Sequence, residues 1–176
     1  GDSSQSSMTS PKVGPGAPAH VLLQDWLRAN DADEAHGDAS IPVVVAALAP
    51  SVGSRRYSAS EIVYSTGDPR DAAFYLVCAG RLRLMSGNPQ RCVRKLGRGN
   101  AVGVGEFYGK GDDGPRSDTL VASTASTILR LPHDAVRELD TAAPRPALYL
   151  HHLLARTLSG KNSGSKKLYR HNAPNP

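Results

Sequence analysis

The chain has 176 residues, a formal net charge of +5 and only 5% aromatic residues. Its length suits one domain, and because aromatics are scarce we expect a core of Val, Leu, Ile and Ala. The two cysteines exclude the disulfide framework of small secreted domains, and no apolar run of about 18 residues is present to span a membrane. The positive charge favours anionic partners.

The two ends of the chain differ in composition from its middle. Residues 1–18 are rich in Ser, Gly and Pro and carry no signal-peptide pattern, so we expect a disordered tail and a cytoplasmic location. Residues 161–176 are polar and basic, and we expect a mobile tail that can lie against an acidic membrane surface. One domain is therefore predicted over residues 19–160.

The predicted domain begins with apolar residues at helical spacing. The apolar residues between His20 and Ala29 predict an amphipathic helix whose Trp26 packs on the main body. Residues 30–40 are polar and are interpreted as a linker. The apolar stretch Ile41 to Leu48 predicts a short buried helix, with Ser40 as its N-cap.

From residue 55 to residue 131 the apolar period becomes two, which is typical of strands. Leu82 and Leu84 are expected to face inward, and Arg81 and Arg83 outward. Turn residues separate the short strands, which are predicted at 61–64, 74–78, 81–85, 92–96, 119–125 and 127–131. This pattern predicts a mainly β fold, an antiparallel β-roll or jelly roll with helices at both ends.

The domain closes with two helices. The first is predicted at 134–139. The second begins near Pro146, and its apolar face contains Ala147, Leu150, Leu154 and Leu158. Ser159-Gly160 is expected to end it.

A distinctive order of turns and strands runs through the middle of the chain. Its residues are Gly67-Asp68, Phe74-Tyr75-Leu76-Val77, Gly80-Arg81-Leu82, Gly99, Gly105-Glu106 and Pro115-Arg116-Ser117. With these residues, positions 41–158 resemble the cyclic-nucleotide-binding domain family. The resemblance implies a non-catalytic regulatory module with cAMP or cGMP as the candidate ligand.

The resemblance also implies roles for single residues. Glu106 would accept a hydrogen bond from the ribose hydroxyl, and Arg116, ten residues later, would pair with the cyclic phosphate. Ser117 would add a hydroxyl donor. Gly105 and Phe107, which flank the glutamate, complete the candidate contacts.

Three positions depart from the family pattern. Counting four residues from Gly99 gives Gly103-Val104 in place of a Gly-Glu pair, so using Gly105-Glu106 requires two more residues in the loop. Tyr108 stands where the family has a small residue. Asp118 stands where the family has alanine, next to the expected phosphate. Asp112 and Asp113 add negative charge to the same loop.

The segments that flank the predicted roll resemble those of one group of proteins within the family. A leading helix, the pair Phe107-Tyr108 and the segment 148–154 look like the cytoplasmic C-terminal domain of SulP-type anion transporters. This resemblance implies a membrane-tethered parent protein, with the rest of the transporter as a partner.

Other functions find less support in the sequence. Adjacent helical residues such as His151 and His152 point about 100° apart and cannot share one metal ion, so they are interpreted as polar surface. Cys78 and Cys92 lie in predicted strands and are interpreted as buried, unreactive thiols. Nucleic acid is a less favoured partner because no recognition helix or aromatic series is present. A ligand-free protein-interaction module stays open as an alternative.

Overall fold

A computed structural model describes residues 14, 16–31, 34–109 and 114–158 of the chain. Within these ranges the chain forms eight strands and five helices. Most of the predicted N-terminal tail, residues 32 and 33 of the predicted linker, Asp112, Asp113, Ser159-Gly160 and the whole basic tail lie outside the described residues.

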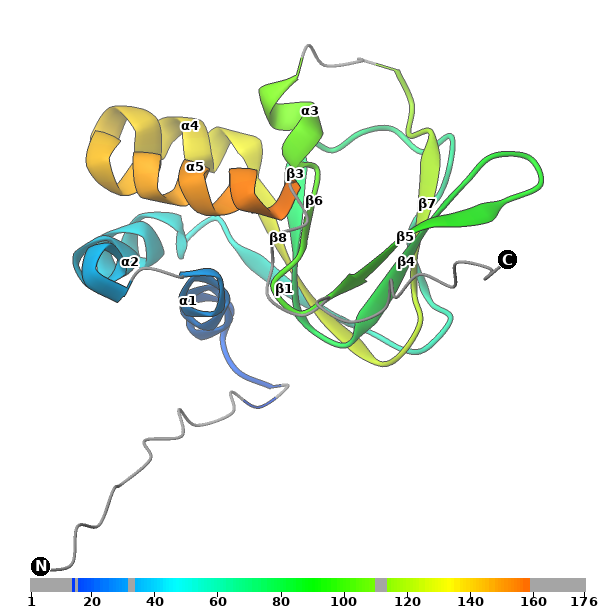
Figure 1. Ribbon diagram of the computed structural model, residues 1–176, viewed down its shortest axis with the longest axis horizontal. Coiled ribbons are helices and arrows are strands. Elements are labelled where there is room, and N and C mark those ends of the chain that lie inside the picture. The colour runs from blue at the N-terminus through cyan, green and yellow to red at the C-terminus, as the bar shows by residue number, and fades with distance from the viewer. Residues whose placement is uncertain (1–13, 15, 32–33, 110–113, 159–176) are drawn as a thin grey trace, which may run out of the picture.

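Two four-stranded antiparallel sheets form the β-roll (Figure 1). The first sheet has the order β1 (Gly53–Tyr57), β8 (Ser126–Pro132), β3 (Ala73–Ala79) and β6 (Ala101–Val102). The second has the order β2 (Ile62–Tyr64), β7 (Asp118–Ala122), β4 (Arg81–Ser86) and β5 (Arg91–Gly97). The fold predicted from the strand pattern is therefore confirmed.

The interior of the roll is filled by alternate residues of both sheets. Leu82, Leu96 and Leu120 of the second sheet pack against Val77 and Ile128 of the first. In β4, Leu82 is buried and Leu84 half-buried, whereas Arg81 and Arg83 are exposed, as the alternation predicts.

The helices cover the other face of the first sheet (Figure 1). Strand β3 is buried on both faces, because Phe74, Leu76 and Cys78 pack toward the helices while Tyr75 and Val77 point into the roll. The covering helices are α1 (Ala19–Asn30), α2 (Glu34–Leu48), α4 (His133–Ala142) and α5 (Pro144–Leu158). Trp26 is fully buried among them, as predicted.

The predicted linker over residues 30–40 is wrong in part, because α2 already begins at Glu34 and Ser40 lies inside it. The buried residues Ile41, Val44 and Leu48 fix the second half of this helix by packing. Polar residues can extend a helix that packing has already nucleated, so a polar composition alone did not mark a linker.

Two of the four edge strands, β1 and β5, also differ from expectation. Strand β1 was not predicted because only Tyr57 of its five residues is buried. Cys92 lies on the edge strand β5 and is exposed, which corrects its interpretation as a buried thiol. At the end of α5, Leu158 is 51% exposed, and Leu153 takes its place in the core.

Candidate ligand cleft

The short helix α3 (Val104–Tyr108) projects from the end of β6 and is positioned by Gly103. Gly103 has a φ of 89°, and a Cβ atom at this position would lie 2.6 Å from the carbonyl oxygen of Ala73. Only glycine fits such a left-handed turn against a neighbouring backbone. Val104 is buried in the core, and Glu106, about 200° further around the helix, is half-buried on the opposite side of α3.

A cleft of about 730 Å³ lies beside α3. Its walls come from the β2–β3 loop, α3, the segment before β7 and the start of α4. The lining residues are Gly67, Pro69, Arg70, Ala72, Glu106, Phe107, Gly109, Gly114, Pro115, His133 and Arg137. Of the five candidate contacts predicted from the sequence, Glu106 and Phe107 line this cleft, and Gly105, Arg116 and Ser117 do not.

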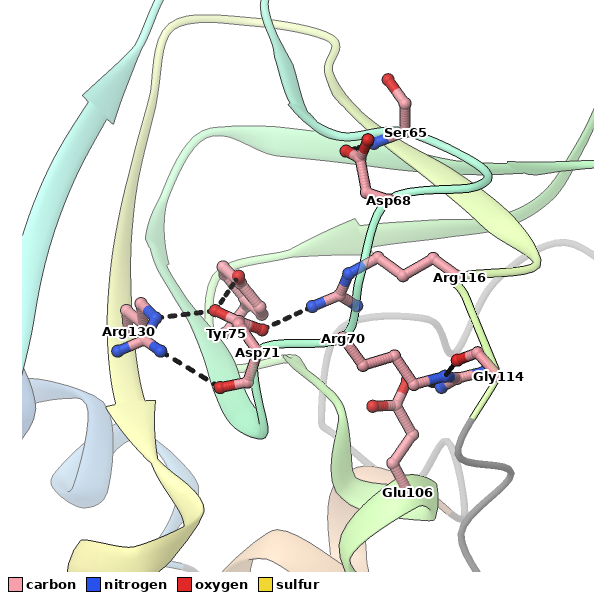
Figure 2. Close-up of polar contacts among 9 residues, drawn as sticks. All are labelled: Ser65, Asp68, Arg70, Asp71, Tyr75, Glu106, Gly114, Arg116 and Arg130. Atoms are coloured by element: carbon pink, nitrogen blue, oxygen red, sulfur yellow. Dashed lines mark hydrogen bonds and ion pairs between the residues drawn. The ribbon is translucent and has the colours of Figure 1, made fainter.

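Glu106 is already engaged by a cation of the β2–β3 loop. Its Oε1 atom lies 2.5 Å from Nη1 of Arg70. The same guanidinium donates from Nε to the carbonyl oxygen of Gly114, at 2.9 Å (Figure 2). Arg70 therefore bridges the helix that carries Glu106 and the segment that leads to Arg116.

Arg116 is turned toward a second carboxylate, that of Asp71. Nη2 of Arg116 lies 2.6 Å from Oδ1 of Asp71, and the Arg116 side chain is only 3% exposed (Figure 2). Its guanidinium carbon sits 3.8 Å from the centre of the Tyr64 ring and 5.5 Å from that of Tyr75. A buried arginine that is paired and stacked in this way is firmly held.

Asp71 is the centre of this network. Its Oδ2 atom accepts hydrogen bonds from Tyr75 Oη and from Arg130 Nε, both at 2.7 Å. Burial by itself raises the pKa of Asp71, but these hydrogen bonds and the charges of Arg130 and Arg116 bring it below its ordinary value of 3.8. Neither Asp71 nor Arg70 was predicted as a site residue, although the run Asp68-Pro69-Arg70-Asp71 just before a buried strand concentrates charge at a turn.

His133 forms the apolar end of the cleft together with Phe107. Its ring centre lies 4.4 Å from that of Phe74 and 5.0 Å from that of Phe107, and its Nε2 atom has no hydrogen-bond partner. Burial, followed by the charge of Arg137, lowers the pKa of His133. The imidazole is therefore neutral near pH 7.

Tyr108 ties α3 to the terminal helices. Its hydroxyl group is hydrogen-bonded to Nδ1 of His151 on α5, and Nε2 of His151 lies 2.6 Å from Oδ1 of Asp140 on α4. Burial and the charge of Asp140 raise the pKa of Tyr108 to about 12, so the phenol stays protonated. The interpretation of His151 as mere polar surface is wrong, because its ring contacts Tyr108 and Asp140. These contacts could not be predicted, since the sequence gives no sign that α3 lies beside His151.

The remaining predicted positions lie around the cleft. Gly105 and Ser117 are exposed. Asp118 does not line the cleft. Burial is the main cause of the raised pKa of Tyr64, and the charge of Asp118 is the next largest cause. Cys78 is buried, and burial raises its pKa to about 12, which makes its thiol unreactive. Among the described residues no three His, Cys, Asp or Glu side chains are grouped to hold a metal ion.

The fold is an antiparallel β-roll flanked by helices, and its cleft lies beside α3. The family model of the cyclic nucleotide-binding domain matches residues 54–141, half of the chain. The chain therefore belongs to the cyclic nucleotide-binding domain family.

Solved structures agree with this assignment. A cyclic nucleotide-binding domain from Methylobacillus flagellatus is 21% identical with a TM-score of 0.67, over 82% of this chain and 80% of that one. The catabolite activator protein of Thermus thermophilus is 27% identical with a TM-score of 0.53, over 70% and 55%. The regulatory domain of Toxoplasma gondii PKA, solved with cAMP, is 16% identical with a TM-score of 0.57, over 81% and 50%.

Comparison with curated protein sequences finds no match. None of the helices in the described ranges is long and apolar enough to cross a bilayer.

Proposed function

We propose that this domain is a non-catalytic regulatory module that binds a cyclic nucleotide weakly, because the ligand must displace Arg70 from Glu106 and must share Arg116 with Asp71. Family membership supports the ligand class, cAMP or cGMP. The observation that carries the proposal is that both charged residues expected to contact the ligand are already in ion pairs. Glu106 is paired with Arg70, and Arg116 is paired with Asp71.

The two ion pairs hinder binding to different degrees. The Glu106–Arg70 pair is partly exposed, with side chains 31% and 21% accessible, and such pairs exchange partners at low cost. Arg116 is almost fully buried, and removing its carboxylate partner would leave a charge without compensation. We therefore propose that a ligand displaces Arg70 from Glu106, while Arg116 keeps Asp71 and offers its remaining N–H donors to the phosphate.

A thermal-unfolding experiment tests the ligand class. A ligand that binds the folded state stabilises it by about 2.7 kcal/mol at a hundred times its dissociation constant. We expect a rise in the unfolding midpoint with cAMP or cGMP at millimolar concentration, and no rise with AMP. Arg116→Gln should abolish the rise, and the exposed Arg55→Gln should keep it. Absence of any shift in the native protein would favour the ligand-free interaction module.

We further propose that the domain belongs to the cytoplasmic part of a SulP-type anion transporter. The support is the aromatic pair Phe107-Tyr108 and the sequence 148–154, which match that outline. The rival parent is another signalling protein, in which the domain would act as a sensor of cAMP or cGMP. Deleting this domain from the full-length parent should change sulfate uptake by membrane vesicles. A parent without transmembrane segments would overturn the transporter assignment.

A further inference from the structure

The outer face of the β2-β7-β4-β5 sheet takes no part in the cleft. Leu82, Leu96 and Leu120 point into the roll, so their neighbours along each strand point outward. The helices pack on the other sheet, and Figure 1 shows β4, β5 and β7 on the side away from them. No described helix therefore covers this face.

The strand register places one row of four side chains across this face. Ile62 of β2 pairs with Val121 of β7, Val121 with Arg83 of β4, and Arg83 with Lys95 of β5. Ile62 is 52% exposed, and Arg83 and Lys95 are exposed. Half of the row is apolar and half is cationic. Arg81, two residues before Arg83 on β4, adds a further exposed cation on the same side.

The positive charge of this face is not balanced within the described part of the chain. Arg83 and Lys95 are directly opposite, and like charges in that arrangement destabilise a sheet. The four strands contain one acid, Asp118, which shares the inward direction of Leu120. Among the described residues, Arg81, Arg83 and Lys95 take part in no ion pair. An external anion would relieve this repulsion.

We propose that this face binds the surface of an anionic lipid bilayer. The cationic half would contact acidic headgroups, and Ile62 with Val121 would enter the boundary between headgroups and acyl chains. A nucleic acid fits less well, because the row has no aromatic side chain to stack on bases and would bury Ile62 against hydrated phosphates. The inference does not depend on whether the cleft binds a cyclic nucleotide.

Co-sedimentation of the full chain with vesicles tests the proposal. We expect binding to vesicles of phosphatidylcholine with phosphatidylserine, weakened by salt, and none to phosphatidylcholine alone. The double variant R83Q/K95Q should bind about 30-fold more weakly, since each basic side chain near an anionic bilayer contributes a factor of about five. Ile62→Ser should also weaken binding without changing the charge.

The control is R56Q/R145Q, which removes the same charge from two exposed arginines outside this face. It should bind as the native protein does. Absence of binding to phosphatidylserine vesicles, or equal losses in the two double variants, would overturn the proposal. The proposal would also be overturned if the native protein bound duplex DNA and not the vesicles, and if R83Q/K95Q abolished the binding to DNA. Because R83Q/K95Q removes the repulsion between two facing cations, its unfolding midpoint should be unchanged or higher, which confirms that the variant folds.

Discussion

Arg116 is held against Asp71 at 2.6 Å beneath the ring of Tyr64, so the arginine that the family resemblance assigned to the phosphate is part of an internal network here. The same carboxylate binds Arg130 and Tyr75. Asp71 therefore connects the β2–β3 loop with the strands β3 and β8 and with Arg116, which lies two residues before β7. Several predictions concern this network and the cleft beside it.

Asp71→Ala should lower the free energy of unfolding by about 1–3 kcal/mol. Breaking a buried ion pair costs about 3–5 kcal/mol, and the cost is reduced here because the Asp71 side chain is 31% exposed. Urea unfolding at neutral pH measures the change. Asp134→Ala is the matched control, because its pair with Arg137 is exposed and should contribute less than about 1 kcal/mol. Equal losses in the two variants would contradict the central position of Asp71.

Gly103→Ala should destabilise the protein and displace α3. The new Cβ would lie 2.6 Å from a backbone oxygen at a φ of 89°, and strained positions of this kind cost about 1–3 kcal/mol. Gly105→Ala is the control, because nothing lies within 4 Å of its Cβ position. In a helix this second change should be neutral or stabilising by about 0.5–1 kcal/mol. Thermal unfolding of both variants separates the two expectations.

The stability should fall as the pH drops below about 6.5, the ordinary pKa of histidine. Burial and the charge of Arg137 lower the pKa of His133 in the folded protein, so the unfolded chain takes up its proton at a higher pH than the folded chain does. Protonation therefore favours unfolding. His133→Phe should flatten the dependence of the unfolding free energy on pH between about pH 5 and 7. An unchanged slope in the variant would show that other groups cause it. The lowered pKa of Asp71 acts in a separate window, where stability is lost as the pH falls below 3.8.

One thiol should react quickly with a thiol reagent in the folded protein. Cys92 is exposed on β5, whereas Cys78 is buried and burial raises its pKa to about 12. Cys92→Ser should remove the fast phase, and Cys78→Ser should remove only the thiol that appears on unfolding. Two fast thiols in the native protein would contradict the packing of β3 against α1.

Local patterns predicted much of the fold because they reflect burial directly. The alternation of Arg81 to Leu84 and the helical spacing around Trp26 correspond to one buried face each. The start of α2 and the strand β1 were missed because their side chains are mostly polar, and packing elsewhere holds them in place. Turn and edge positions of this kind carry little apolar signal.

The candidate site was only partly predictable for a different reason. Glu106 and Phe107 lie on α3 and line the cleft, and the family resemblance had named both of them as candidate contacts. Arg70 and Asp71 contact residues about forty positions away in the sequence, and no local pattern reveals such pairing. The ion pairs that occupy the site therefore emerged only from the three-dimensional arrangement.

Calorimetric titration of cAMP and cGMP into the native protein and into Arg70→Gln tests the central claim most directly. If Arg70 restrains Glu106, the variant should bind the preferred nucleotide more tightly than the native protein, and adding Glu106→Gln should remove the gain. No saturable heat in either protein, or weaker binding by Arg70→Gln, would contradict the account.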